Sequence, residues 1–241
     1  MRKIVTATAV LALSAGAAMA NGAHGKMDEP VVEPIIHEPP APGFNWTGGY
    51  AGVFVGLPLG SEFWDSTVGA QSTPGDWSGT PWGAMLGYNF QRGNMVLGGE
   101  IDYTVSTLTG ISVTNPGPNP PAFACNIGNE CVTDVNGLFS LRARAGIAMD
   151  RTLFYGTAGI AFGRVTGTTF DAADDPFVHG EENRTGWTAG VGVEHAITNR
   201  LTLRGEYIHT DLGRTDLLDA CGGCFTDVSF GVVRIGGAFR F

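Results

Sequence analysis

Beyond its first 20 residues the sequence has no apolar run near the roughly 20 residues that a membrane-spanning helix needs. Charged residues make up only 15% of the chain, and Lys26 is the one lysine after the N-terminal stretch. A soluble chain with so few charges would normally show amphipathic helices, and the pattern for them is missing too. These absences exclude a helical membrane protein and argue against a soluble helical domain.

Positive charge is also scarce. Acidic residues outnumber basic ones by 23 to 14, and the formal net charge is −9. Loss of Arg2 and Lys3 with an N-terminal leader would make the remaining chain more acidic by two charges. An acidic chain repels a phosphate backbone, which argues against nucleic acid as a partner.

Residues 1–20, MRKIVTATAVLALSAGAAMA, have the three parts of a secretory signal peptide. Arg2 and Lys3 supply a basic start, an apolar stretch follows, and Ala18-Met19-Ala20 is a small-x-small cleavage site. The stretch is too short for a membrane helix. No cysteine follows the cleavage point, so we expect an exported protein without a lipid anchor there.

Residues 21–45 differ from the rest in composition. Acids alternate with prolines, which are Pro30, Pro34, Pro39, Pro40 and Pro42. This composition predicts an extended, solvated periplasmic linker of polyproline character. The alternative is a binding segment, for example one that contacts peptidoglycan.

From Trp46 onward apolar residues recur with a period of two, which is typical of strands. Eight segments exceed the 9 to 11 residues of a membrane strand. They are 46–57, 80–91, 94–106, 135–149, 151–163, 185–198, 200–212 and 227–241. Tight turns alternate with long connections at 58–79, 107–134, 164–184 and 213–226. The pattern predicts an all-β fold over 46–241: an eight-stranded antiparallel transmembrane β-barrel with short periplasmic turns and four long extracellular loops.

Alternation also predicts which face each side chain occupies. In the last segment Val233, Ile235 and Phe239 point one way, and Arg234 and Arg240 the other. A slip of one residue would turn such charges into lipid, so the register is strongly specified. The predicted lumen charges are Glu100, Asp102, Arg142, Arg144, Glu194, Arg204, Glu206, Arg234 and Arg240. Aromatic residues near segment ends suit interfacial girdles; they are Trp46, Trp82, Tyr88, Phe90, Trp187, Tyr207, Phe239 and Phe241.

Two hypotheses fit the lumen charges. Eight strands leave an interior just wide enough for side chains to fill, which favours a salt-bridged plug. Arginine suits such a plug because its planar fork pairs with carboxylates through two bonds. The alternative is a narrow ion or solute path that opens when the pairs rearrange.

Four cysteines lie in two of the long connections. Three pairings are possible, and an oxidising compartment favours two local disulfides, Cys125–Cys131 and Cys221–Cys224. Metal binding and redox chemistry at Cys221-Gly222-Gly223-Cys224 are the alternatives. No thioredoxin-like unit surrounds this stretch, so loop staples are the preferred interpretation.

Other polar clusters give weaker signals. Loop acids crowd one connection, namely Asp171, Asp174, Asp175, Glu181 and Glu182, without calcium-loop spacing. A solvated loop is expected there, with a divalent cation between the loop and lipopolysaccharide as the alternative. His195 and His209 lie in different strands, and no nucleophile elbow or metal spacing accompanies them. We therefore predict no catalytic residue, no metal and no cofactor.

Three stretches carry a family resemblance: FNWTGGYAGVFVG at 44–56, RGEYIHTDLG at 204–213 and RIGGAFRF at 234–241. They resemble the small eight-stranded outer-membrane β-barrel proteins, the opacity/porin-like immunogenic surface proteins. His209 stands where that group often has an aromatic residue. The resemblance implies the bacterial outer membrane as the location, with its lipids and lipopolysaccharide as partners. It also implies that Phe239 and Phe241 form the signal read by the barrel-assembly machinery.

The resemblance is specific for fold and location and weak for activity. The expected role is structural, in envelope integrity and as a surface antigen, for a monomer without catalysis. A narrow porin is the first alternative, and a loop-based adhesin or ligand receptor is the second.

Overall fold

A computed structural model describes residues 44–62, 64–66, 75–105, 108–113, 130–170, 176–218 and 224–241. All of them belong to one compact unit, Pro40–Phe241. The expected signal peptide and the linker up to residue 43 lie outside the described residues. Across the ranges described, no helix is both long and apolar enough to span a membrane.

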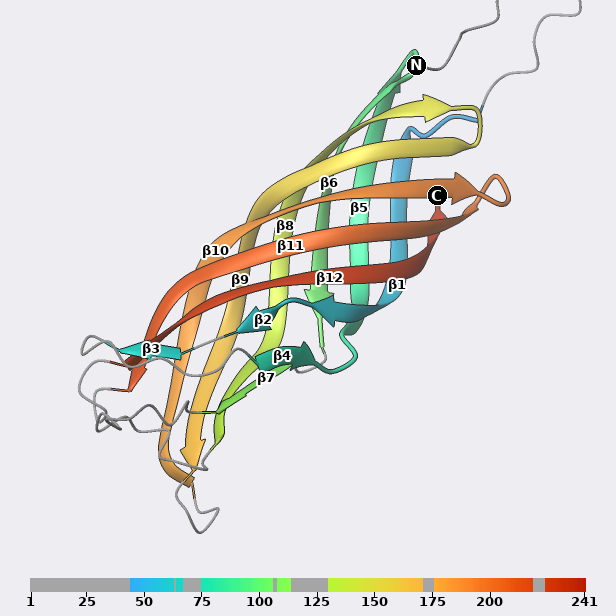
Figure 1. Cartoon of the computed structure of the whole chain (residues 1–241). Helices are drawn as coiled ribbons and strands as arrows, with labels where there is room; N and C mark the ends of the chain where they lie inside the picture. Colours follow the sequence, from blue (N-terminus) through green and yellow to red (C-terminus); the bar gives the residue numbers. More distant parts are fainter. Residues whose placement is uncertain are drawn as a thin grey trace, which may run out of the picture. The chain divides into compact units, whose positions relative to one another are not determined.

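Eight long strands form a closed antiparallel ring (Figure 1). They are β1 (Gly48–Leu59), β5 (Trp82–Arg92), β6 (Met95–Thr104), β8 (Glu130–Met149), β9 (Thr152–Phe170), β10 (Pro176–Ala196), β11 (Leu201–Leu218) and β12 (Cys224–Arg240). Each strand pairs with its neighbour along this series, and β12 returns to β1 with Tyr50 opposite Arg240 and Val55 opposite Ile235. The predicted eight-stranded antiparallel fold is confirmed.

The two ends of the ring differ. At one end, here called the turn end, Gly93-Asn94 joins β5 to β6 and Asp150-Arg151 joins β8 to β9. Gly93 (φ 60°) and Asp150 (φ 51°) adopt the left-handed conformation that these residue types tolerate in tight turns. The opposite, loop end carries four short strands: β2 (Ser61–Glu62), β3 (Trp64–Ser66), β4 (Gly75–Ser78) and β7 (Leu108–Val113).

Several strands run further toward the loop end than the sequence pattern indicated. β9 continues to Phe170 and β10 begins at Pro176, so only 171–175 separates them where a connection over 164–184 was expected. The strand ends expected from the sequence were set where the apolar alternation required by lipid stops. Backbone pairing needs no such alternation, and the β-branched residues Val165, Thr166 and Thr168 favour a strand beyond that point.

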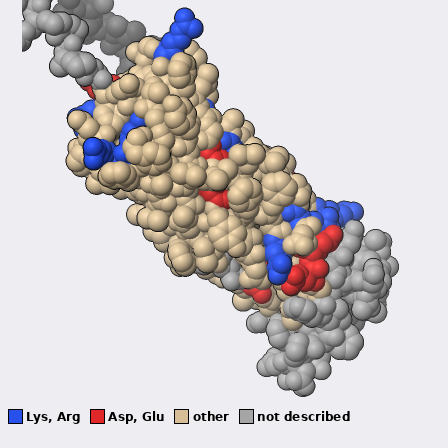
Figure 2. Space-filling model, turned by 180° about the vertical axis from the view of Figure 1, so that it is seen from behind, with Lys and Arg blue, Asp and Glu red and all other residues tan. Residues whose placement is uncertain are grey.

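Side chains sort onto two faces as the alternation predicted. Leu86, Leu97 and Ile235 are each about half exposed or more on the outer wall. Figure 2 shows, on the face seen from behind, a broad band of mainly uncharged side chains along the middle of the barrel, with a few charged atoms visible in it and most charged side chains toward the two ends. The band marks the part of the wall that suits the hydrocarbon layer of a membrane.

The interior has a polar middle between two apolar clusters, and a third apolar cluster of Tyr50, Phe54, Met85 and Ala238 lies on the side of β1 and β5. The turn-end cluster consists of Trp46, Val96, Ala148, Leu153, Tyr155 and Ala196. The loop-end cluster consists of Trp77, Leu108, Val135, Ala161, Val165, Leu212, Val228 and Phe230. Trp77 comes from β4, and its ring is tilted by 58° against that of Phe230, with the centroids 5.4 Å apart. Its indole N–H donates to the carbonyl of Ser229.

Trp46 corrects one expectation. The sequence pattern assigned it to an aromatic girdle facing the membrane interface, but its side chain is fully buried within the turn-end cluster. Phe44 packs edge-on against it at 4.8 Å, and Asn45 accepts a hydrogen bond from Arg240, so barrel contacts include the last two residues of the expected linker. Trp46 lies an even number of residues before the inward-facing Tyr50 and Phe54, so the alternation of β1 already places it inside, and the girdle assignment followed only its position near a segment end.

The outer face of β8 gives a matched test of membrane depth. We expect Ala143→Arg, midway between Phe139 and Met149 on this face, to destabilise the folded barrel by about 2–4 kcal/mol, because arginine is costly at the bilayer midplane. Met149→Arg lies on the same face at the turn end, where the cost falls to about 0–1 kcal/mol. Reversible urea unfolding in lipid vesicles measures both, and equal losses would contradict the assigned depth.

Candidate functional site

The polar middle of the lumen is built by strands that each point every second residue inward. β6 supplies Glu100 and Asp102, β8 supplies Arg142 and Arg144, and three other strands supply the remaining members, Glu194, Arg204, Glu206, Arg234 and Arg240. All nine predicted lumen charges lie inside, each at most 5% exposed. Eight of them form one connected set of ion pairs, here called the lumen network.

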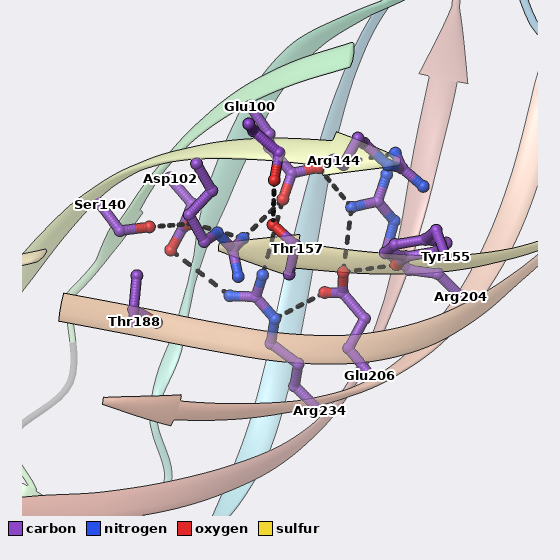
Figure 3. A network of polar contacts seen from close by, with 12 residues as sticks. Glu100, Asp102, Ser140, Arg144, Tyr155, Thr157, Thr188, Arg204, Glu206 and Arg234 are labelled. Atoms are coloured by element: carbon purple, nitrogen blue, oxygen red, sulfur yellow. Dashed lines mark hydrogen bonds and ion pairs between the residues drawn. The ribbon is translucent and has the colours of Figure 1, made fainter. Parts of the chain in front are cut away.

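Glu100 is the most highly connected member (Figure 3). Its Oε1 accepts from Nη2 of Arg142 at 2.6 Å, and its Oε2 accepts from Nη1 of Arg204, also at 2.6 Å. The hydroxyl of Tyr50 donates to the same Oε2 at 2.7 Å. Charge-assisted bonds of this length are among the strong ones, so Glu100 ties β1, β6, β8 and β11 together.

Asp102, two residues along β6 toward the loop end, is a second carboxylate on which several hydrogen bonds converge. Its Oδ2 accepts from Ser140 Oγ and from Arg142 Nη2, both at 2.6 Å, and its Oδ1 accepts from Arg234 Nη1 at 3.4 Å. One nitrogen of Arg142 therefore bridges the two carboxylates of β6. This bridge offsets the repulsion between two acids on the same face of one strand.

The other half of the network lies toward the turn end and across the barrel. Glu194 accepts from Arg144 at 2.8 Å and from Arg204 at 3.2 Å. Glu206 accepts from Arg234 Nε at 2.7 Å and from the hydroxyl of Tyr155. The guanidinium of Arg144 lies 3.9 Å from the centroid of the Tyr155 ring, which adds a cation–π contact.

Charge in the network is balanced, with Glu100, Asp102, Glu194 and Glu206 against four arginines. Such balance is needed because an unpaired charge in this interior would cost several kcal/mol.

Arg240 is the predicted member that the structure places apart from the network. It donates to the carbonyls of Asn45 and Thr47, and its guanidinium lies 5.2 Å from the Trp46 ring. Arg240 thus fixes the chain that enters β1 at the turn end.

Two residues that hydrogen-bond to the network, Tyr50 and Tyr155, escaped the sequence prediction. In β1, alternation puts Tyr50 on the face opposite to the one that carries the outward-facing Val53 and Val55. The inward direction of Tyr50 could therefore have been predicted from the sequence. Tyr155 gave no such signal, because both faces of β9 are apolar near the turn end: Leu153 is buried and Phe154 is exposed.

Apolar clusters flank the network toward both ends of the lumen. A cavity of about 30 Å³ lies between the network and the loop-end cluster, lined by Asp102, Arg142 and Arg234 on one side and Leu108 and Phe230 on the other. That volume is large enough for a water molecule and too small for a solute.

The remaining predicted groups lie outside the network. Cys125 and Cys221 fall outside the described residues. Cys131 lies in β8, opposite Ser112 and Thr169, and Cys224 is the first residue of β12, so these two belong to strands and not to the long connections that were expected. Asp171, Asp174 and Asp175 are also outside, while Glu181 pairs with Arg164 at 3.3 Å and Glu182 with Arg184 at 2.9 Å.

The two histidines lie apart from each other in the barrel wall. His195 is 3.0 Å from Thr152 Oγ1, and His209 Nε2 is 3.4 Å from Ser229 Oγ. Within the described ranges no carboxylate is hydrogen-bonded to either imidazole, and no group of three or more His, Cys, Asp or Glu could hold a metal ion. A serine and a histidine without an orienting third group do not make a hydrolytic triad.

A closed eight-stranded ring with an apolar outer band and a charge-paired interior defines a small outer-membrane β-barrel. The model of the outer membrane protein beta-barrel domain family matches residues 5–241. The chain belongs to this family, and its location is the bacterial outer membrane. The turn end is therefore periplasmic and the loop end extracellular.

Two sequence relatives and one solved structure support this family assignment. A 31 kDa outer-membrane immunogenic protein of Brucella melitensis is 34% identical over 231 residues, which cover 86% of this chain and 91% of the relative. A 25 kDa outer-membrane immunogenic protein of Brucella abortus is 32% identical over 210 residues, covering 87% and 84%. Among solved structures, the outer membrane protein OprG from Pseudomonas aeruginosa covers 82% of this chain and 97% of its own, with 14% identity and a TM-score of 0.52.

Removal of Glu100 tests the network directly. We expect Glu100→Ala to destabilise the barrel by about 3–5 kcal/mol, because Arg142 and Arg204 lose their shared carboxylate in a buried site. The double variant Glu100→Ala/Arg204→Met should lose less than the sum of the two single changes, since it removes one uncompensated charge. Strict additivity in urea unfolding would show that the two side chains do not interact.

Proposed function

We propose that this protein is a closed, structural barrel that contributes to envelope integrity and presents a surface antigen at its extracellular end, without catalysis. The observation that carries the proposal is the neutral lumen network, closed by an apolar cluster on each side. A permeation path would need a continuous polar lining, and here Trp77 and Phe230 at one end and Trp46 and Leu153 at the other interrupt it.

The antigen role is supported by the extracellular end. β9 and β10 pair beyond the aromatic residues Phe162 and Trp187 and carry the exposed charges Arg164 and Glu181 past the apolar band. The Brucella relatives are named as immunogenic proteins. A rigid hairpin that projects from the membrane presents one stable shape for recognition. The same projection favours an adhesin or ligand receptor as the alternative.

We further propose the partners that this role requires. Outer-membrane lipids and lipopolysaccharide contact the apolar band, and the linker reaches peptidoglycan. Phe239 and Phe241 point outward at the periplasmic end, 51% and 74% exposed, where the barrel-assembly machinery would find them as its signal. The two disulfides, Cys125–Cys131 and Cys221–Cys224, would staple the extracellular loops of a monomer.

Single-channel recording in a planar bilayer tests the closed lumen. We expect silence from wild-type protein at high load, once a mobility shift on heating has shown that it is folded. Arg142→Ala should raise conductance, because it removes the side chain that bridges Glu100 and Asp102 and leaves polar space beside the cavity. Met149→Arg, on the outer face of the same strand, is the control and should stay silent.

Discrete, reproducible steps from the wild-type protein would overturn the proposal in favour of a narrow porin. Loop deletions distinguish the adhesin alternative from a porin. If the protein is an adhesin, the deletions should abolish binding to a host surface or ligand and leave the conductance trace unchanged.

A further inference from the structure

A groove of about 650 Å³ crosses the outer wall of β6, β8, β9 and β10 near the extracellular end. A bulge in β8 opens it, where the register shifts between Asn136 and Leu138 and Gly137 takes a φ of 68°. Gly137 has no side chain to fill the space, and an added Cβ would lie 2.8 Å from the hydroxyl of Tyr103. The groove faces away from the lumen and so has no part in the network.

Two adjacent rows of side chains line the groove, and strand register fixes both. The lower row is aromatic: Tyr103 pairs with Phe139, and Phe139 with Phe162. The upper row is polar: Asn136 pairs with Arg164, and Arg164 with Asn183. The change from aromatic to polar side chains within one step of the ladder marks the boundary between hydrocarbon and headgroups.

Arg164 is the charged member of the upper row. Its side chain is 55% exposed, and its Nε pairs with Glu181 at 3.3 Å. Within the described contacts its two terminal nitrogens have no partner, and they form the fork that binds a phosphate through two parallel bonds. Arg184, Asn183 and Thr185 line the same groove.

We propose that this groove binds an outer-leaflet lipid that carries a phosphate on a sugar headgroup, as lipid A does. The phosphate lies on Arg164, and the first part of an acyl chain lies on Phe139 and Phe162, whose rings are 6.1 Å apart. The position at the hydrocarbon boundary and the charge of Arg164 favour a lipid headgroup over a free anion. The proposal rests on the outer-membrane location and is independent of whether the lumen conducts.

Lipid adducts of the detergent-solubilised full-length protein, counted by native mass spectrometry, test the site. The probes are diphosphorylated lipid A, the same lipid after removal of its phosphates, and inorganic phosphate as a competitor. Arg164→Gln should weaken binding of diphosphorylated lipid A roughly tenfold, as expected for one charge-assisted contact. Glu181→Gln should strengthen binding, because it releases the Nε of Arg164.

Arg200→Gln is the matched control, an exposed arginine at the periplasmic end, and it should leave affinity unchanged. A mobility shift on heating confirms that each variant is folded, which is expected for exposed side chains. The proposed site would be wrong if Arg164→Gln bound diphosphorylated lipid A as tightly as the wild-type protein does. It would also be wrong if the wild-type protein bound lipid A equally well with and without its phosphates. Competition by inorganic phosphate at the concentrations at which lipid A binds would overturn the assignment to a lipid. Because conductance is not measured, failure here leaves the closed-lumen proposal standing.

Discussion

Every backbone N–H and C=O of a strand in hydrocarbon must find a partner within the protein, and this requirement governs the architecture. It is met by pairing β12 with β1, so that the eight long strands have no open edge within the apolar band. Ring closure then determines which side chains face inward and leaves an interior that they must fill. The lumen network and the two apolar clusters follow from that limited volume.

The interior is filled in two ways, by paired charged side chains and by apolar side chains. Charges occupy the middle, where carboxylates and guanidinium groups from five strands can reach one another, and tyrosines supply further donors. Apolar side chains occupy the ends, where Trp46 precedes β1 and Trp77 comes from a short extracellular strand. Neither tryptophan belongs to the ring itself, so segments outside the eight strands contribute to filling both ends of the interior.

Much of this could be predicted from the sequence, because one rule, alternation, determines both register and face. It placed Arg142, Glu206 and the other network charges inward, since charge on the lipid face is so costly. The rule failed where its premise did not hold. Tyr155 lies where both faces of β9 are apolar, and Val165–Phe170 lies beyond the apolar band, where alternation is not required. Trp46 shares the parity of the inward-facing Tyr50, so its wrong assignment came from its position near a segment end and not from alternation. The arrangement of pairs within the network depends on barrel geometry that spacing does not contain.

The pairing of Glu100 with Arg204, and of Asp102 with Arg234, joins residues far apart in the chain. While the barrel assembles, β6 and β8 can come together early, because they are close in sequence and bring Arg142 to both acids. Until β11 and β12 arrive, Glu100 and Asp102 lack half of their cations, and the incomplete sheet still has open edges. Backbone closure and charge neutralisation are therefore completed in the same late step. This coupling makes partly closed intermediates costly in lipid and favours all-or-none assembly.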